Sequence, residues 1–369
     1  MTLLPAKTVD SIDGFEAWLR SLSDLNAGLW IWTYFLHSRF ALDFAFEETC
    51  AGAPGVKRER RGLPLFTLSR TVGRDEPRRV DAWFVLNSIP NTPILKLITV
   101  SDREVWHKAI LPFVKERSPR VAPVYFMQTE LLEGFRELQR SLQPGLRLNL
   151  TRASTKERIA LRGRQHRAGK RYRSNVTYTD ESIDAVFDLA KERGQSFKSL
   201  SLDVESGGSD ADREVVASMT VSNQGCIAWS RLAKQLDLQI ESTLFDRAQR
   251  RLALFRSRDL RARNYEADKP LAIEFEASVF EDARAVRSFG SVMLRYPSSA
   301  TAVLHENPYF HMLLADEQDG SSMDLWILNP RRILVVPRLN TSEAALNRLL
   351  NFVSENFREA HVTEYDGDE

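Results

Sequence analysis

Apolar residues in the first part of the chain follow helix and strand spacings in turn. Phe15, Trp18, Leu19 and Leu22 recur at intervals of three and four, which predicts an amphipathic helix over Ser11–Leu25. Further on, apolar runs bounded by turn residues predict buried strands. These strands are Leu65–Val72, Val80–Leu86, Ile94–Val100 and Val121–Met127.

Helices are predicted between and after the last of these strands. Ser101 and Glu104 match a capping box, which indicates the start of a helix that should run to about Lys115. Thr129–Leu142 has helical character and is followed by Pro144. Strands that alternate with helices are typical of an α/β layer with at least one parallel crossover. We therefore predict such a layer in the N-terminal part.

The C-terminal part has the most regular pattern. Short apolar runs separated by turn residues predict strands, and Ser342 can cap a helix that follows them. An antiparallel meander covered on one face by this helix fits the pattern. The predicted core face of the helix consists of Leu346, Leu349, Leu350, Val353 and Phe357.

Together these patterns predict an α+β fold with two domains. Residues 1–148 form the N-terminal α/β domain, and residues 149–369 form a basic connector and a C-terminal α+β domain that ends in the meander and its covering helix. Leu146–Leu150 is itself strand-like, so the alternative that both parts share one sheet stays open.

Composition is that of an ordinary soluble domain. Hydrophobic residues make up 43% of the chain and charged residues 27%, with a formal net charge of +1 and two cysteines. The longest apolar run, Leu29–Leu36, is too short to span a membrane, and the N-terminus lacks the pattern of a signal peptide. We expect a cytoplasmic protein with no membrane partner and no disulfide scaffold.

Positive charge is nevertheless concentrated in two stretches. Between Thr151 and Ser174 there are nine arginines and lysines against one acid, Glu157, and a second group of arginines lies between Arg247 and Arg263. Dense positive charge with little neutralisation indicates a polyanion-binding surface. The predicted phosphate-contacting residues are Arg158, Arg162, Arg164, Arg167, Lys170, Arg171, Arg173, Arg250, Arg251, Arg256 and Arg258.

Both basic stretches have an alternative interpretation. The first could be a solvated linker between ordered parts. In the second, Arg256 and Arg258 are two residues apart, so on a strand they would share one charged face. The arginines of such a strand could pair with nearby acids such as Asp246 and Asp259 instead of with phosphate.

Aromatic residues are dense between Leu29 and Phe46, and Trp30, Trp32 and Tyr34 are among them. Such a run could form a stacking platform for bases. A nucleic-acid groove would require several interleaved basic residues, whereas Arg39 is the one basic side chain in this run. The sequence therefore favours a hydrophobic core wall.

Candidate metal ligands occur in the C-terminal part: His305, His311 and Asp316, with Asp319 and Asp324 nearby. Imidazole and carboxylate groups can bind a first-row metal. The alternative is packing for the histidines and turn formation for the aspartates.

Motifs of known enzyme classes are missing from the sequence. A restriction-type nuclease would need an acid two residues before Lys96, where Ile94 stands, although Asp81 precedes that strand suitably. The chain contains no nucleophile elbow, phosphate loop or dinucleotide motif. We predict no cofactor, and the sequence favours a protein that is not an enzyme.

The favoured hypothesis is a non-enzymatic nucleic-acid-binding subunit of a larger DNA- or RNA-processing assembly. Its contacts would be sequence-independent, and it could have protein partners in that assembly. One alternative is a metal-dependent hydrolase or nuclease that uses His305 and His311. Another is a protein-interaction scaffold for an acidic partner, in which the acidic tail Glu364–Glu369 could shield the basic stretch.

Overall fold

The computed structural model describes most of the chain. The described residues are 2–5, 8–22, 28–38, 50, 52–59, 62–73, 75–89, 92, 94–118, 121–159, 175–179, 182–207, 213–232, 236–259, 269–306, 309–338, 340–365 and 367.

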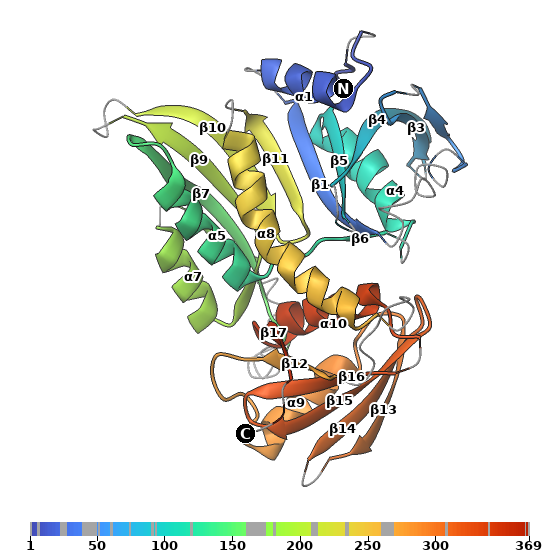
Figure 1. The fold of residues 1–369 in the computed structure, drawn as a ribbon, viewed down its shortest axis with the longest axis vertical. Coiled ribbons are helices and arrows are strands. Elements are labelled where there is room, and N and C mark those ends of the chain that lie inside the picture. The colour runs from blue at the N-terminus through green and yellow to red at the C-terminus, as the bar shows by residue number, and fades with distance from the viewer. Residues whose placement is uncertain are drawn as a thin grey trace.

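Eleven strands of the described chain form one large sheet (Figure 1). Its order is β2-β3-β4-β5-β1-β11-β10-β9-β7-β8, and β6 pairs with β1. The strands are β1 (Trp30–Ser38), β2 (Val56–Arg58), β3 (Leu65–Val72), β4 (Arg78–Ser88), β5 (Ile94–Ser101), β6 (Val121–Pro123), β7 (Leu146–Glu157), β8 (Asn175–Tyr178), β9 (Gln195–Ser206), β10 (Glu214–Ser222) and β11 (Cys226–Arg231).

A second sheet contains six of the described strands in the order β13-β14-β15-β16-β12-β17. The two sheets and their helices confirm an α+β fold. The strands are β12 (Leu271–Glu274), β13 (Ser299–His305), β14 (Phe310–Asp316), β15 (Ser321–Asn329), β16 (Arg332–Pro337) and β17 (His361–Glu364).

The strand pairing of the described residues differs from the predicted organisation in two respects. Every strand pairing in the described part of the chain is antiparallel, so the expected parallel crossover is not among them. The predicted domain boundary at residue 148 falls inside β7, and β11 pairs with β1 to make one sheet from both sides of that boundary. The open alternative of a shared sheet is the one observed, and the second sheet begins only at β12.

Helices pack on both faces of the large sheet. In Figure 1, α5 (Gln128–Ser141), α7 (Ile183–Glu192) and α8 (Leu236–Ser257) lie on the near side of the β7–β11 half. A continuous helical segment on the other face, near β3 and β4, consists of α3 (Arg103–Val105), the π-helical turn η1 (Trp106–Ile110) and α4 (Leu111–Lys115).

The start of this helical segment differs from the predicted capping box. Asp102, not Ser101, is the N-cap residue, and its side chain accepts a hydrogen bond from the Val105 amide at 2.8 Å. Ser101 instead belongs to β5, where its backbone still pairs with β1. The predicted end at Lys115 is confirmed.

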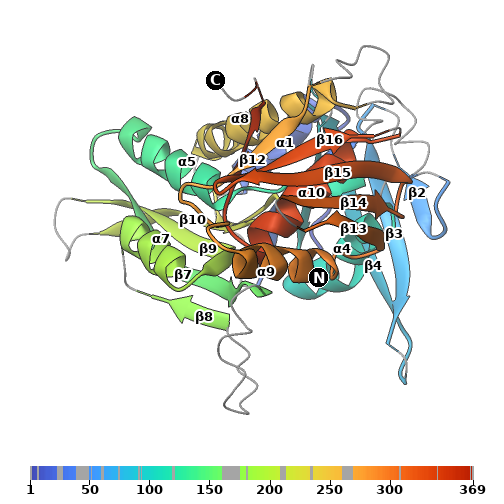
Figure 2. The ribbon, with the colours of Figure 1, turned by 90° about the horizontal axis from the view of Figure 1, so that it is seen from below.

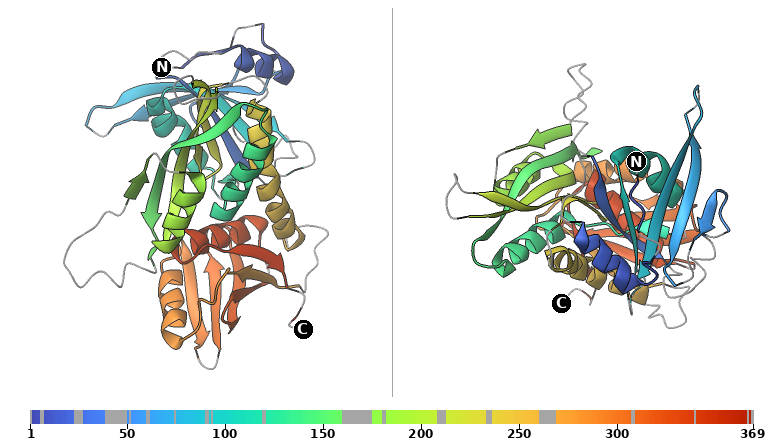
Figure 3. Two further views of the ribbon diagram at one scale, coloured as in Figure 1. Left: turned by 90° about the vertical axis from the view of Figure 1, so that its left-hand side faces the viewer. Right: turned by 90° about the horizontal axis from the view of Figure 1, so that it is seen from above.

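The remaining helices are α1 (Ile12–Ser21), α9 (Ala283–Met293) and α10 (Glu343–Asn356). Helix α10 lies between the two sheets (Figures 1 and 3). Ser342 caps it as predicted, because its hydroxyl accepts from the Ala345 amide at 3.1 Å. The predicted core face of α10 is also confirmed, since all five of its residues are buried.

The alternation of side chains along β1 divides the interior into two cores. Ile31 and Phe35 belong to the core under α5 and α8, which continues to α10 and the second sheet. Trp32, Tyr34 and Leu36 belong to a smaller core beneath η1 and α4. Successive side chains of a strand point to opposite faces, so the two cores lie on opposite sides of the sheet.

Arg158, at the end of β7, connects the large sheet with α10 through buried contacts. Its guanidinium donates to the backbone oxygens of Ser354 in α10 (2.8 Å) and Gln195 in β9 (2.7 Å). Its Nη2 also lies 3.1 Å from Glu359, whose carboxylate accepts from the Gln128 amide at the start of α5 (2.7 Å). The side chain is 3% exposed.

We predict that Arg158→Ala lowers the free energy of unfolding by about 3–5 kcal/mol, because it leaves the Glu359 charge and two buried carbonyls unpaired. Urea unfolding measures the change. The control is Arg152→Ala, which removes an exposed arginine from the same strand and should cost about 0.5 kcal/mol or less. Equal losses in the two variants would contradict the role assigned to Arg158.

Candidate functional site

Six of the predicted phosphate-contacting residues lie outside the described residues: Arg162, Arg164, Arg167, Lys170, Arg171 and Arg173. Three others are buried. Arg158 has the internal partners given above; Arg251 donates to the Tyr125 carbonyl and lies 3.4 Å from Glu130. Arg258 donates to the Lys269 carbonyl at 3.0 Å and to Glu364 at 2.9 Å. Because these three guanidinium groups are buried and donate to internal acceptors, they are not available to a phosphate backbone.

The second basic stretch is helical, so the strand that was considered for Arg256 and Arg258 does not form. Residues 247–257 form the end of helix α8, on which Arg250 and Arg256 are exposed. Leu244, Ala248, Leu252 and Phe255 are buried at intervals of four and three, a helical spacing that the sequence already contained.

Arg247, at the start of the same stretch, pairs with two acids of α5. Its Nη1 lies 2.6 Å from Glu133 and its Nη2 lies 2.7 Å from Glu137. Pairing with acids was the alternative interpretation of this stretch, and it holds for Arg247 with different acids from those expected. The second stretch is thus partly a helix–helix contact.

A groove of about 550 Å³ lies on the opposite face of the large sheet, where the cover provided by η1 and α4 ends. One wall is aromatic. Trp30, Trp32 and Tyr34 alternate along β1 and therefore share a face, and Trp106 of η1 stacks on Trp32 with ring centroids 4.6 Å apart. Trp30 is half-buried, while Trp32 is largely enclosed by its neighbours.

Tyr34 is the most deeply placed side chain of this wall. It is 1% exposed, and its hydroxyl has no hydrogen-bond partner among the described residues. Burial, with a smaller contribution from Cys226, raises the pKa of Tyr34 well above its usual value. Burial likewise raises the pKa of the Cys226 thiol. Both groups are therefore neutral, and they contribute no charge to the groove.

The floor of the groove consists mainly of small side chains of β11, β10, β9 and β7, in two rows that are in register with β1. One row runs from Trp32 through Ala228, Thr220 and Ser201 to Arg152. The hydroxyls of Ser201 and Thr220 are hydrogen-bonded to each other at 3.0 Å. The parallel row consists of Tyr34, Cys226, Ser222, Ser199 and Ser154.

Cations from three separate elements face this floor. Arg103 of α3 places its guanidinium 4.7 Å from the Trp30 ring centroid. Arg152 and Lys156 come from β7, and Lys198 comes from β9. Arg152 and Lys198 are exposed, and Arg152 forms no ion pair with any residue in the described ranges.

One carboxylate, Glu355 of α10, is among the described residues that line the groove. It lies 2.6 Å from the Lys156 ammonium and accepts from the Asn223 amide at 3.0 Å. His107 lines the groove as well. Burial, Arg103 and Lys115 lower the pKa of its imidazole, which is therefore neutral at neutral pH. The positive charge of the groove thus comes from arginine and lysine.

This arrangement corrects the expectation for the aromatic run. Trp32 and Tyr34 are core residues, as the sequence favoured, but with Trp30 they also form the wall of a groove. The basic residues that the run itself lacks are supplied by β7, β9 and α3. Sequence spacing could not place them there, because they lie far from β1 along the chain.

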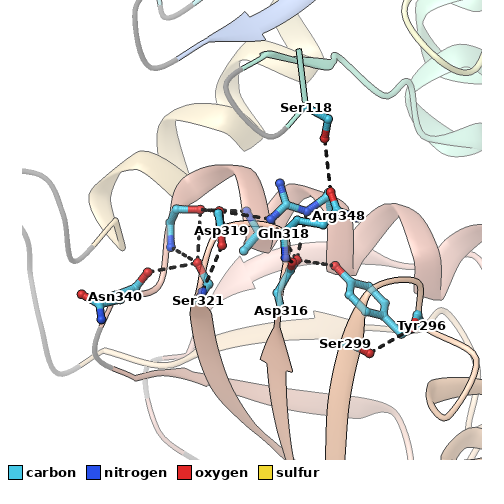
Figure 4. A network of polar contacts seen from close by, with 11 residues as sticks. Ser118, Tyr296, Ser299, Asp316, Gln318, Asp319, Ser321, Asn340 and Arg348 are labelled. Atoms are coloured by element: carbon cyan, nitrogen blue, oxygen red, sulfur yellow. Dashed lines mark hydrogen bonds and ion pairs between the residues drawn. The ribbon is translucent and has the colours of Figure 1, made fainter. Parts of the chain in front are cut away.

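The structure brings two of the candidate metal ligands together, because His305 and His311 are cross-strand partners on β13 and β14, but Asp316 lies at the other end of β14. Asp316 is fully buried; it accepts from Tyr296 at 3.1 Å and from Arg348 at 2.9 Å (Figure 4). The ring of His311 stacks on Trp326 and its Nε2 lies 3.1 Å from Asp324. His305 instead packs against Tyr309, with ring centroids 4.5 Å apart.

No group of three or more histidine, cysteine, aspartate or glutamate side chains within the described ranges could hold a metal ion. Asp316 and Asp319 instead neutralise Arg348, whose Nη2 lies 3.1 Å from Asp319 (Figure 4). Their interaction fixes the turn between β14 and β15 to α10. The same turn contacts the N-terminal part, since Ser118 donates to Gln318 at 3.2 Å.

Comparison with known proteins adds no family assignment: no protein-family model matches the chain, and no curated protein has a similar sequence. Among the described helices, none is long and apolar enough to cross a membrane. The geometry of the groove is therefore the basis for a functional conclusion.

We predict that Mg²⁺, Mn²⁺ and Zn²⁺ leave the Tm of the protein at its value in EDTA, because Asp316 is held by Arg348 and the histidines face other partners. A metal bound at a hundred times its Kd would stabilise the fold by about 2.7 kcal/mol. Thermal unfolding with each ion provides the measurement. A rise in Tm that His311→Ala abolishes would support a metal site instead.

Proposed function

We propose that this protein binds single-stranded nucleic acid along the groove of the large sheet, without catalysing a reaction on it. The observation that carries the proposal is an aromatic wall that faces cations across a floor of hydroxyl groups. In such a site the cations contact phosphates, and the aromatic faces stack on bases. Neither contact depends on base sequence.

The aromatic wall favours single strands over duplexes. Bases in a duplex are stacked on one another, so their faces are not available to Trp30 or to the Arg103 guanidinium above it. The serine and threonine hydroxyls of the floor suit phosphate and sugar oxygens. Base stacking also favours nucleic acid over an acidic protein, which could use the cations but would leave the wall unused.

The basic stretch extends the proposed surface. Its two attachment points are paired neighbours, because Lys156 of β7 is in register with Asn175 of β8, at the edge of the sheet (Figure 2). Lys156 itself lines the groove. We propose that the cations from Arg162 to Arg173, which lie between these two strands in the sequence, contribute further phosphate contacts.

Membership of a larger assembly is the second part of the proposal. Large exposed apolar side chains gather on the second sheet and the end of α9, around a groove of about 700 Å³. Three acids, Glu281, Asp282 and Glu306, and one cation, Arg287, also line it. Such patches are typical of protein–protein contacts, and the acids favour a partner segment that is both apolar and basic. The exposed apolar residues are Leu294, Val303, Leu304, Tyr309 and Leu328.

We predict that the double variant Arg152→Glu, Lys198→Glu weakens binding to oligo-dT and oligo-rU alike. The slope of log K against log salt concentration should fall by about 0.7 for each lost phosphate contact. Fluorescence anisotropy at several salt concentrations measures both quantities. Reversal of charge at Arg162, Arg164, Arg167 and Arg171 should act in the same way.

The matched control for this double variant is Arg250→Glu, Arg256→Glu. These two exposed arginines were predicted to contact phosphate, but they lie on α8, across the sheet from the groove, so we no longer assign them that role. The affinity of this control variant should equal that of the wild-type protein. If only the α8 variant lost affinity, the binding surface would lie on the α8 face and not in the groove. If the wild-type protein had no measurable affinity for any nucleic acid, the proposal would be refuted.

We predict that Trp30→Ala lowers the affinity for single strands by about 1–3 kcal/mol, the contribution of one base–aromatic stack. Affinity for a duplex of the same length should change little, because duplex binding would use the cations alone. Anisotropy with both ligands measures the difference. Trp18→Ala, a change to a partly buried tryptophan of α1 outside the groove, controls for general effects of tryptophan loss. An equal loss for both ligands would contradict the role of stacking.

A further inference from the structure

A second pocket, of about 260 Å³, continues the groove past α10. The two cavities share the lining residues Gln224 and Glu355, so they adjoin each other. The pocket lies between α10, the β6 region and the turn that follows β10. Its volume is slightly below the roughly 300–1,000 Å³ typical of sites for drug-sized ligands, which suits a small ligand or one part of a larger one.

The polar side of this pocket is one face of α10. Asn347, Asn351 and Glu355 recur at intervals of four, so they lie above one another along the helix. The opposite face of α10 consists of its buried apolar residues. The side chains that line the pocket are therefore fixed in place by the packing of the helix on the core.

The amide of Asn347 is buried without a partner. The residue is 0% exposed, and neither its Nδ2 nor its Oδ1 has a hydrogen-bond partner among the described residues. The Oδ1 of Asn351 is in the same situation. An unpaired buried polar group destabilises the fold, so its retention calls for an explanation such as a bound ligand.

Neighbouring amides do have partners. Asn356 donates from Nδ2 to the Phe352 carbonyl at 2.9 Å, and Asn223 donates to Glu355 at 3.0 Å. Among these asparagines, unpaired amide atoms are thus found only at Asn347 and Asn351.

Charge in this pocket is largely neutralised. Arg348 lines it, but Asp316 and Asp319 pair with the guanidinium (Figure 4). Lys156 pairs with Glu355 at the junction with the groove. A phosphate would find little net positive charge here, whereas an uncharged polar group would be accommodated.

The remaining walls are flat and apolar, and include Phe352, Pro123 and Pro297. A primary amide presents a donor and an acceptor side by side, which matches the edge of a nucleobase; the best match is adenine, through its N6 and N7. Apolar walls suit the faces of the same heterocycle.

From this geometry we infer that the pocket binds a nucleobase, adenine above the others, through the amides of Asn347 and Asn351. The base belongs to a strand held in the neighbouring groove or to a free nucleotide. The strand-borne case rests on the proposed function. In that case, binding along the groove is independent of base sequence, and binding at this one position selects the base.

The test compares wild type with Asn347→Leu in anisotropy titrations of oligo-dA, oligo-dC and oligo-dT, and in calorimetric titrations of adenosine monophosphate. Leucine is close to asparagine in shape and removes both unpaired polar atoms, so the Tm should be unchanged or higher. Affinity for oligo-dA should fall roughly tenfold, to the level of oligo-dT, with no change for oligo-dT. Asn351→Ala should show the same selective loss.

The matched control is Gln239→Leu, which replaces an amide of α8 that bonds to Ser141, outside both cavities. It should leave the preference for oligo-dA intact. If oligonucleotides do not bind but adenosine monophosphate does, and Asn347→Leu abolishes that binding, the proposed function fails and the nucleobase pocket stands. If all three oligonucleotides bind equally and Asn347→Leu behaves as wild type, the pocket inference is overturned and the proposed function stands.

Discussion

The structure depends on the two-sidedness of β1. Its even-numbered residues from Trp30 to Leu36 face η1 and α4, while Ile31 and Phe35 face α8 and the main core. Because β1 also pairs with β5 on one side and β11 on the other, it joins two halves of the chain into one sheet. On the face of the even-numbered residues, η1 and α4 cover the sheet only as far as β1. The exposed face of β11, β10, β9 and β7 then becomes a groove with an aromatic wall.

Helix α10 links this groove to the second sheet (Figure 3). Its apolar face completes the core, and its polar face carries Glu355 into the groove and Asn347 into the adjoining pocket. Arg158 holds α10 through the Ser354 carbonyl near its C-terminal end, and Arg348 of α10 itself pairs with Asp316 of the second sheet. Arginines that are conspicuous in the sequence thus serve as internal ties, and they position the residues proposed to bind ligand.

Local sequence patterns were sufficient for several elements. The cap at Ser342 and the apolar face of α10 follow from side-chain chemistry within a few residues, and the structure confirms both. Charge patterns were less informative. Arg251 and Arg258 lie in a basic stretch of the kind that forms binding surfaces, but both are buried. Only their internal partners in the tertiary structure show that they belong to the core. For α8, helical spacing among the apolar residues was present, but the arginines between them suggested a strand.

By itself the sequence determined which faces of its helices and strands are apolar, because periods of 3.6 and 2 residues are properties of the local backbone. It also determined that positive charge is concentrated beside β7. Tertiary structure decided which strands are neighbours, which arginines reach solvent and which residues share a cavity. Those outcomes depend on contacts between distant segments, such as Trp32 of β1 with Ala228 of β11, and Lys156 of β7 with Glu355 of α10. A periodic pattern specifies that a face must be covered, and the packing of the whole chain selects what covers it.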